Sequence, residues 1–238
     1  MKKTKTLIMA SYGLEPKQVT LETMAALKEC GVVFSHCLAG GKGGFISRSC
    51  AKFESLRGLS LAETAGKVKK AFSAHDTVGF LTYGNPFFLN ATAALINTTM
   101  KADGVKVIIL PAVSSFDAII NQMDLNKFSR TGLRLVDTAA AMKEMMFTPE
   151  MDTLFFVIGD LNFKGNECYR TAFLKGLGKA YPGGHPVSII NCPTIEDASG
   201  RLIATTVSKL KTVFLKADKA TTILVPAVQQ KAVTSAGL

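Results

Sequence analysis

Short apolar runs alternate along the first half of the chain with segments of helical spacing. The run Thr6–Met9 predicts a buried strand that leads into a polar turn. Past that turn, Thr20 stands directly before apolar residues spaced three and four apart, which indicates a capped helix. Gly31 ends this helix, and Val32–Phe34 is the second apolar run. A strand, a helix and a further strand in this order predict a parallel crossover.

The alternation continues up to residue 112. Ser60 begins a capping-box pattern that predicts a helix through about Ala74, and Thr77–Thr82 predicts the next buried strand. A loop and a further helix lead to the β-branched run Val105–Leu110, which stops at a proline. Residues 45–60 have no strong period and are interpreted as a surface excursion. This order favours a mostly parallel sheet with helices on both faces.

The second half of the chain predicts a different sheet. Its expected strands are Thr153–Ile158, Pro186–Asn191, Ile203–Thr206 and Thr221–Val225. Three of them are close enough in sequence to pair as antiparallel neighbours. The expected fold is therefore α/β with two lobes, in which residues 1–112 carry the mostly parallel sheet and residues 113–238 carry a mixed sheet.

Composition narrows the class of protein. Hydrophobic residues make up 47% of the 238, which is ample for a continuous core. No run approaches the roughly 18 apolar residues of a membrane span, and the apolar run near the N-terminus is too short for a signal peptide. The five cysteines include no CxxC pair, so neither a disulfide framework nor a zinc knuckle is indicated. Free thiols favour a reducing compartment, and we expect a cytoplasmic location.

The net charge of +10 favours anionic partners such as RNA, an acidic peptide or a polycarboxylate. The lysines alternate with apolar residues, as is usual on solvent-exposed faces of helices and strands. The interleaved arginine and aromatic residues that are typical of a nucleic-acid-binding surface do not occur in the sequence. Nucleic-acid binding is therefore not favoured.

The loops that follow strands are the candidate ligand-binding sites, because ligands of open α/β sheets bind beyond the carboxyl ends of the strands. These loops are residues 10–16, 83–88 and 111–115. Asn85 offers a donor and an acceptor within Tyr-Gly-Asn-Pro, although an ordinary turn explains that segment equally well. The pair Ser114-Ser115 lies outside a GxSxG motif and favours a helix cap. No phosphate-binding or dinucleotide motif follows a strand, and the isolated histidines indicate no metal site.

Taken in order, the three loops resemble those of the tetrapyrrole methylase superfamily. The matching segments are Lys17–Thr23, Tyr83–Pro86 and Pro111–Asp117. The resemblance implies a methyltransferase dependent on S-adenosylmethionine (SAM), with SAM in a cleft between the two lobes and S-adenosylhomocysteine as its product. It also implies a homodimer. The residues that it places at the cofactor are Tyr12, Asn85, Phe88, Ser114, Ser115, Ile158 and Cys192.

Within the superfamily, the sequence is most similar to the borosin-type peptide backbone N-methyltransferases. That branch surrounds the target amide with tyrosines and an arginine, and Arg57 and Tyr83 match two of these positions, which implies catalytic roles for both. The other two tyrosine positions are Ala51 and Leu61 here. The first loop also departs from the family's Gly-x-Gly and contains Tyr12 instead.

The leading expectation is N-methylation of backbone amides in a separate precursor peptide, because the chain ends soon after the last expected strand and carries no appended substrate segment. One alternative is C-methylation of a tetrapyrrole or corrinoid precursor, whose carboxylates would meet the positive charge. Another is a non-catalytic SAM-binding or scaffold protein. A visible-light spectral change with a tetrapyrrole precursor distinguishes the first two.

Overall fold

The computed structural model describes residues 4–39, 44–46 and 48–228. The chain folds as two compact units. The first unit contains Met1–Ala118 together with Thr194–Glu196, and the second contains Ile119–Pro193 together with Asp197–Leu238. Most of the glycine-rich segment 40–44 lies outside the described residues. None of the described helices is long and apolar enough to cross a membrane.

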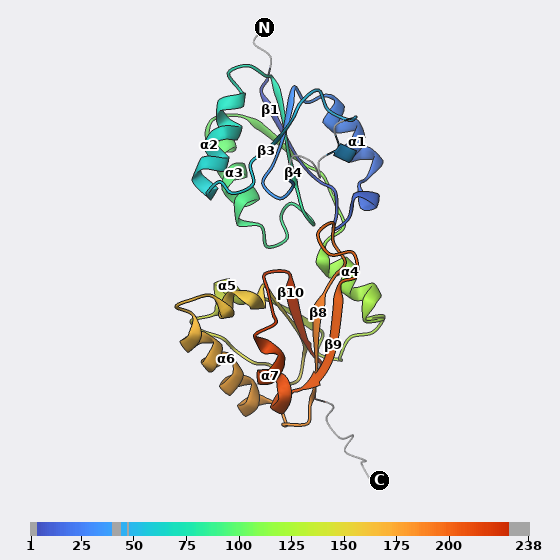
Figure 1. Ribbon diagram of the computed structural model, residues 1–238, viewed down its shortest axis with the longest axis vertical. Helices are drawn as coiled ribbons and strands as arrows, with labels where there is room; N and C mark the ends of the chain where they lie inside the picture. The colour runs from blue at the N-terminus through green and yellow to red at the C-terminus, as the bar shows by residue number, and fades with distance from the viewer. Residues whose placement is uncertain (1–3, 40–43, 47, 229–238) are drawn as a thin grey trace, which may run out of the picture. The chain divides into compact units, whose positions relative to one another are not determined.

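The first unit contains a parallel five-stranded sheet with the order β3-β2-β4-β1-β5 (Figure 1). Its strands are β1 (Thr6–Ser11), β2 (Val32–Ser35), β3 (Phe53–Ser55), β4 (Thr77–Thr82) and β5 (Lys106–Ile109). Its helices are α1 (Leu21–Lys28), α2 (Leu61–Ala71) and α3 (Ala91–Ala102), a 3-10 turn η1 covers Pro16–Gln18, and α4 (Ser115–Gln122) begins in this unit. The predicted parallel sheet is confirmed, and β3 is a strand within the segment interpreted as a surface excursion.

Helices cover both faces of this sheet because residues along each strand alternate between two cores. Leu7 and Met9 of β1 pack in one core with residues of α2 and α3, whereas Ile8 and Ala10 pack in the other with Leu27 of α1. Figure 1 shows α1 on one side of the sheet and α2 and α3 on the other. Burying each large apolar side chain contributes about 1.5–3 kcal/mol, so the two cores hold the strands in register.

Side-chain caps begin α1 and α2 where the sequence predicts them, and α3 begins at a further cap. The hydroxyl of Thr20 accepts a hydrogen bond from the main-chain N–H of Thr23, which satisfies a donor in the first turn of α1. Ser60 and Glu63 form a reciprocal capping box at α2, and Asn90 caps α3. Each of these three helices therefore starts at a position defined by the polar residue before it.

The second unit contains a mixed sheet with the order β6-β7-β10-β8-β9. β6 (Leu133–Asp137) is parallel to β7 (Asp152–Phe156), while β10 (Thr221–Val225) pairs antiparallel with both β7 and β8 (Pro186–Asn191), and β9 (Arg201–Thr206) pairs antiparallel with β8. Its other helical segments are α5 (Thr138–Ala141), η3 (Ile158–Asn162), α6 (Glu167–Ala180), η4 (Val207–Lys209) and α7 (Leu210–Phe214). The mixed sheet is confirmed, and β6 is an additional strand.

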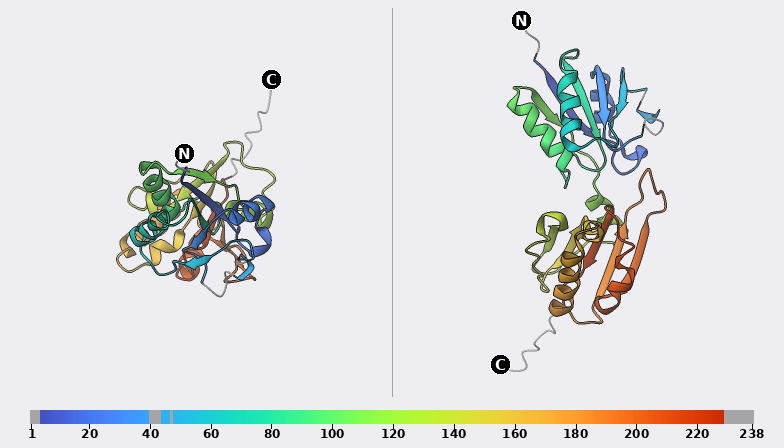
Figure 2. Two further views of the ribbon diagram at one scale, coloured as in Figure 1. Left: turned by 90° about the horizontal axis from the view of Figure 1, so that it is seen from above. Right: turned by 60° about the vertical axis from the view of Figure 1, so that its left-hand side comes forward.

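The predicted end of β7 is wrong. β7 stops at Phe156 rather than at Ile158, because Val157 adopts a left-handed conformation with φ 56° that a strand cannot contain. The chain turns there into η3. In Figure 2, α6 runs along one face of the second sheet, and its residues Phe173 and Leu177 belong to the core of this unit.

Candidate functional site

Two of the predicted loops are joined to each other through their main chains. All strands of the first sheet are parallel, so their carboxyl ends lie along one edge, and β1 lies between β4 and β5. The N–H of Tyr12 donates to the carbonyl of Thr82 at 3.3 Å, and the N–H of Gly84 donates to the carbonyl of Gly13 at 2.9 Å. The loops after β1 and β4 therefore form one connected surface at this edge.

The Tyr-Gly-Asn-Pro segment is an ordered turn. Gly84 has φ 63°, which favours glycine, and a Cβ built there would meet no atom within 4 Å. The Asn85 side-chain oxygen accepts a hydrogen bond from the N–H of Phe87 at 2.9 Å. The space beside Gly84 means that a ligand can approach the main chain of this turn closely.

Phe88 connects the β4 loop to the third predicted loop. Its ring stacks on Phe116 of α4 with centroids 6.4 Å apart. Immediately before α4, the hydroxyl of Ser114 donates to the carboxylate of Asp117 at 2.6 Å, and the Ser114 N–H donates to the same oxygen at 2.7 Å. The helix-cap interpretation of Ser114 is thus confirmed. The hydroxyl, the N–H and the carbonyl of Ser114 all take part in hydrogen bonds at this helix start, and the residue is buried, so a cofactor contact by Ser114 stays a prediction.

Tyr12 is part of the core rather than of an open loop. Only 1% of the residue is exposed, and its ring packs edge-on against Phe45 at 5.9 Å and against Tyr83 at 6.4 Å. Burial raises the pKa of the Tyr12 phenol far above its usual range, and nearby Cys37 raises it further. The phenol therefore stays protonated. A cofactor contact by this residue stays a prediction, and its side chain supports Tyr83.

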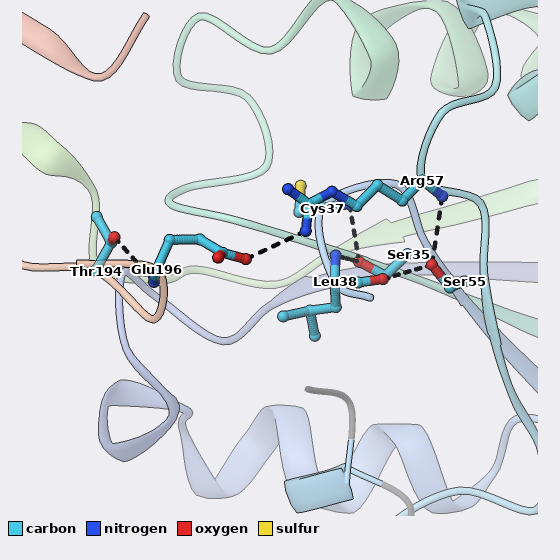
Figure 3. A network of polar contacts seen from close by, with 7 residues as sticks. All are labelled: Ser35, Cys37, Leu38, Ser55, Arg57, Thr194 and Glu196. Atoms are coloured by element: carbon cyan, nitrogen blue, oxygen red, sulfur yellow. Dashed lines mark hydrogen bonds and ion pairs between the residues drawn. The ribbon is translucent and has the colours of Figure 1, made fainter. Parts of the chain in front are cut away.

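Arg57 reaches across the same edge of the sheet (Figure 3). Its guanidinium Nη1 lies 3.3 Å from Oε1 of Glu196, and the two side chains are 55% and 46% exposed. The Arg57 N–H donates to the hydroxyl of Ser55 at 3.3 Å, and that hydroxyl donates to the carbonyl of Leu38 at 2.6 Å. The main chain beneath the arginine is thereby fixed, while the guanidinium remains accessible to solvent.

Cys37 lies among the residues that the sequence singled out. Burial raises the pKa of its thiol, while hydrogen bonds from the Tyr83 main chain and the Thr82 side chain and the positive charge of Arg57 partly oppose that rise. The structure thus brings Arg57, Tyr83 and Tyr12 around the thiol of Cys37, a partly buried residue. Cys37 and Glu196 were missed by sequence reasoning, since neither lies in a recognisable motif.

The two positions at which the borosin branch has further tyrosines carry no side chain that could hydrogen-bond a ligand. Ala51 and Leu61 are both exposed, and neither carries a polar side chain. The aromatic partner of Tyr83 is instead Tyr12, contributed by the altered first loop. The tyrosine cluster implied by the borosin branch is therefore present only in part.

The two remaining cofactor candidates belong to the second unit. Ile158 is completely buried, and Cys192 is 5% exposed with a thiol pKa that burial raises to about 11. In the sheet register, Phe155 pairs with Ile223, and Asn191 pairs with Thr221. The ends of β7 and β8 thus lie at the same edge of the second sheet, on either side of the start of β10, and Ile158 and Cys192 follow directly from them. No cluster able to hold a metal ion occurs among the residues described.

Comparison with known proteins shows which family the chain matches. The family model described as Tetrapyrrole (Corrin/Porphyrin) Methylases matches residues 6–131, which include the three loops predicted to bind a ligand. No curated protein matches the sequence.

Solved structures share the fold over nearly the whole chain. The methyltransferase CobJ is 14% identical with a TM-score of 0.70, and 97% of each chain is covered. The cobalamin biosynthetic enzyme cobalt precorrin-4 methyltransferase, CbiF, is 17% identical with a TM-score of 0.66, covering 93% of this chain and 94% of that one. Uroporphyrin-III C-methyltransferase from Thermus thermophilus, complexed with S-adenyl homocysteine, is 13% identical with a TM-score of 0.65, covering 93% and 97%. At these identities the likeness establishes the fold.

Proposed function

We propose that this chain, which belongs to the family of tetrapyrrole (corrin/porphyrin) methylases, transfers a methyl group from SAM to a carbon atom of a tetrapyrrole or corrinoid precursor. Its family makes it a SAM-dependent methyltransferase. The observation that carries the choice of acceptor is the family match over residues 6–131. Two of the similar structures carry the name of their acceptor: one is a uroporphyrin-III methyltransferase and the other a cobalt precorrin-4 methyltransferase. These names support the same class of acceptor for this chain. A net charge of +10 suits an acceptor rich in carboxylates.

The residues at the sheet edges fit a polar cofactor of this kind. The space beside Gly84 admits a ligand to the main chain of the β4 turn, and the Asn85 amide nitrogen has no partner among the described residues. We assign Asn85, Phe88, Ser114 and Ser115 to cofactor binding. For Ile158 and Cys192 of the second unit, a cofactor contact likewise stays a proposal. The proposed contact by Tyr12 would come from its main chain.

When bound, SAM supplies an electrophilic sulfonium methyl group, so this chain mainly has to position the acceptor and exclude water. Transfer breaks the carbon–sulfur bond, forms a bond to the acceptor carbon and releases a proton from the acceptor. We assign Tyr83 and Arg57 to the acceptor: the tyrosine hydroxyl hydrogen-bonds it, and the guanidinium stabilises negative charge on it. A guanidinium is suited to this role because it holds carboxylates in a fixed geometry.

The second candidate is N-methylation of backbone amides in a separate precursor peptide. The observation that favours it is the aromatic pair Tyr12–Tyr83 near Arg57, since a tyrosine beside a cation could stabilise the deprotonated amide. The exposed Ala51 and Leu61 at the other two tyrosine positions weigh against it. For either acceptor, we propose a homodimer.

The acceptor is tested by incubating the protein and SAM anaerobically with uroporphyrinogen III, and by measuring the masses of both products. We expect S-adenosylhomocysteine together with a tetrapyrrole that has gained one or more methyl groups. SAM binding without methylation of this tetrapyrrole or of a corrinoid precursor would contradict the proposal. A mass gain in a co-expressed precursor peptide encoded beside the gene would favour the second candidate.

A further inference from the structure

The loop between β8 and β9 places a carboxylate next to Arg57. The N–H of Ile195 donates to the carbonyl of Leu14 at 3.1 Å, and the Ile195 side chain packs against the apolar core that contains Tyr12 and Tyr83. The next residue is Glu196, whose N–H donates to the hydroxyl of Thr194 at 3.2 Å. Main-chain bonds and apolar packing therefore position Glu196 independently of its ion pair.

The ion pair itself is suited to exchange. Arg57 and Glu196 meet through one nitrogen and one oxygen at 3.3 Å, rather than through the paired contacts of a bidentate bridge (Figure 3). Both side chains are about half exposed, and exposed pairs of this kind contribute only about 0.2–1 kcal/mol. A carboxylate from a ligand could therefore replace Glu196 at little cost.

The pair also lies near Tyr12, which packs against Tyr83, the other residue assigned to the acceptor. The charges of Glu196 and Arg57 shift the pKa of the Tyr12 phenol in opposite directions, up and down respectively, so both lie within electrostatic range of that phenol. The ring of Tyr12 packs in turn against Tyr83. Glu196 thus holds its carboxylate beside Arg57, where an acidic acceptor bound by that arginine would present its own.

We propose that Glu196 is an internal stand-in for an acceptor carboxylate: it pairs with Arg57 in the unliganded protein and gives up the arginine when a polycarboxylate acceptor binds. This inference rests on the proposed function. Glu196 is then a specificity-determining residue, because a neutral acceptor has no carboxylate with which to displace it. Its presence weakens binding of every acceptor that must take Arg57 from it.

The proposal predicts a measurable coupling between the two residues. With Arg57 present, Glu196→Gln should tighten binding of uroporphyrin III about two- to fivefold, as expected from the strength of an exposed ion pair. With Arg57→Gln as the background, the same substitution should change the dissociation constant little, since the arginine for which Glu196 competes is absent. Coproporphyrin III, in which the acetate side chains are replaced by methyl groups, should show a smaller gain from Glu196→Gln.

The experiment is a double-mutant cycle on the full chain, with porphyrin binding followed by fluorescence and SAM binding by calorimetry. Asp103→Asn is the matched control, because Asp103 forms an exposed ion pair with Lys69 at 2.9 Å beyond the end of α3, at the amino-terminal edge of the same sheet. It removes the same charge, and we expect it to leave the dissociation constant of uroporphyrin III unchanged.

The outcomes separate this inference from the function on which it rests. If Glu196→Gln tightens uroporphyrin III binding equally with and without Arg57, then Glu196 acts only through the overall electrostatic field of the protein. That result overturns the proposed exchange of carboxylates at Arg57, but it leaves the proposed acceptor intact. No gain in the presence of Arg57 also overturns it. If the unsubstituted protein binds SAM but not uroporphyrin III, the proposed tetrapyrrole acceptor fails, and this inference fails with it.

Discussion

At the scale of single residues, the acceptor side of the first unit depends on Tyr83. The residue is half-buried, its ring packs against the fully buried Tyr12, and its main chain hydrogen-bonds the Cys37 thiol. Its ring is thus held by packing, while the strand-end turn places its main chain beside Cys37 in the loop that follows β2. A side chain held this way loses little conformational freedom when it binds a ligand.

Substitution of Tyr83 by phenylalanine tests the role of its hydroxyl. The variant keeps the ring contact with Tyr12 and loses one hydrogen bond to the acceptor, so we expect kcat/KM for the acceptor to fall about tenfold to a hundredfold. The dissociation constant of SAM, measured by calorimetry, should not change. Tyr169→Phe on α6 is the control, and we expect it to keep full activity. Equal turnover by both variants would remove Tyr83 from the proposed site.

His36 makes stability depend on pH. Its ring stacks on Phe80 at 5.3 Å, and burial lowers the imidazole pKa from 6.5 to about 4. The unfolded chain therefore binds a proton that the folded protein excludes. The resulting stability is complete above pH 6.5 and is lost as the pH falls toward 4.

We expect the free energy of unfolding, measured by urea denaturation, to fall less between pH 7 and pH 5 in His36→Gln than in the unsubstituted protein. Glutamine takes up no proton in this range. Parallel losses in the two proteins would show that carboxylates alone cause the acid sensitivity.

At the scale of elements, much of the fold could be predicted because caps and apolar runs are local signals. Thr20 and Ser60 mark helix starts, and the bounds of β4, β8 and β10 agree with the predicted strands. β3 was missed because it is three residues long and exists through its pairing with β2. Similarly, no local signal leads to Glu196, which lies 139 residues from Arg57 in the sequence.

Val157 shows where a local rule fails at a strand end. A β-branched residue in the left-handed region is strained by about 1–2 kcal/mol, and this one directly precedes Ile158, a proposed cofactor contact. Strain of this kind persists only where the surrounding structure holds it. The turn therefore serves to redirect the chain from β7 into η3 at the sheet edge.

The strain at Val157 predicts that a glycine variant is more stable than an alanine variant, which is the reverse of the order in an ordinary strand. We expect Val157→Gly to be more stable than Val157→Ala by about 0.5–1 kcal/mol in urea denaturation, since glycine alone adopts this φ without cost. Val107 in β5 is the matched control, because its conformation is that of an ordinary strand. There the alanine variant should be the more stable of the two. The same order at both positions would contradict a strained conformation at Val157.

At the scale of the whole molecule, the match to the family accounts for the first unit, and the fold likeness extends over both. The sequence predicted the superfamily correctly, because its three strand-end loops occur in the right order. It ranked a peptide above a tetrapyrrole as the acceptor, and the comparisons favour the reverse. The boundary at residue 112 and the homodimer remain proposals.

The most direct test of the central claim follows a labelled methyl group through a single turnover. The protein, with SAM carrying an isotopically labelled methyl, is mixed anaerobically with uroporphyrinogen III, and the product is analysed by nuclear magnetic resonance. The account predicts a methyl resonance from a group bonded to a ring carbon of the tetrapyrrole, in an amount equal to the S-adenosylhomocysteine formed. Label that stays in SAM, or that leaves SAM without appearing on a ring carbon of the tetrapyrrole, would contradict it.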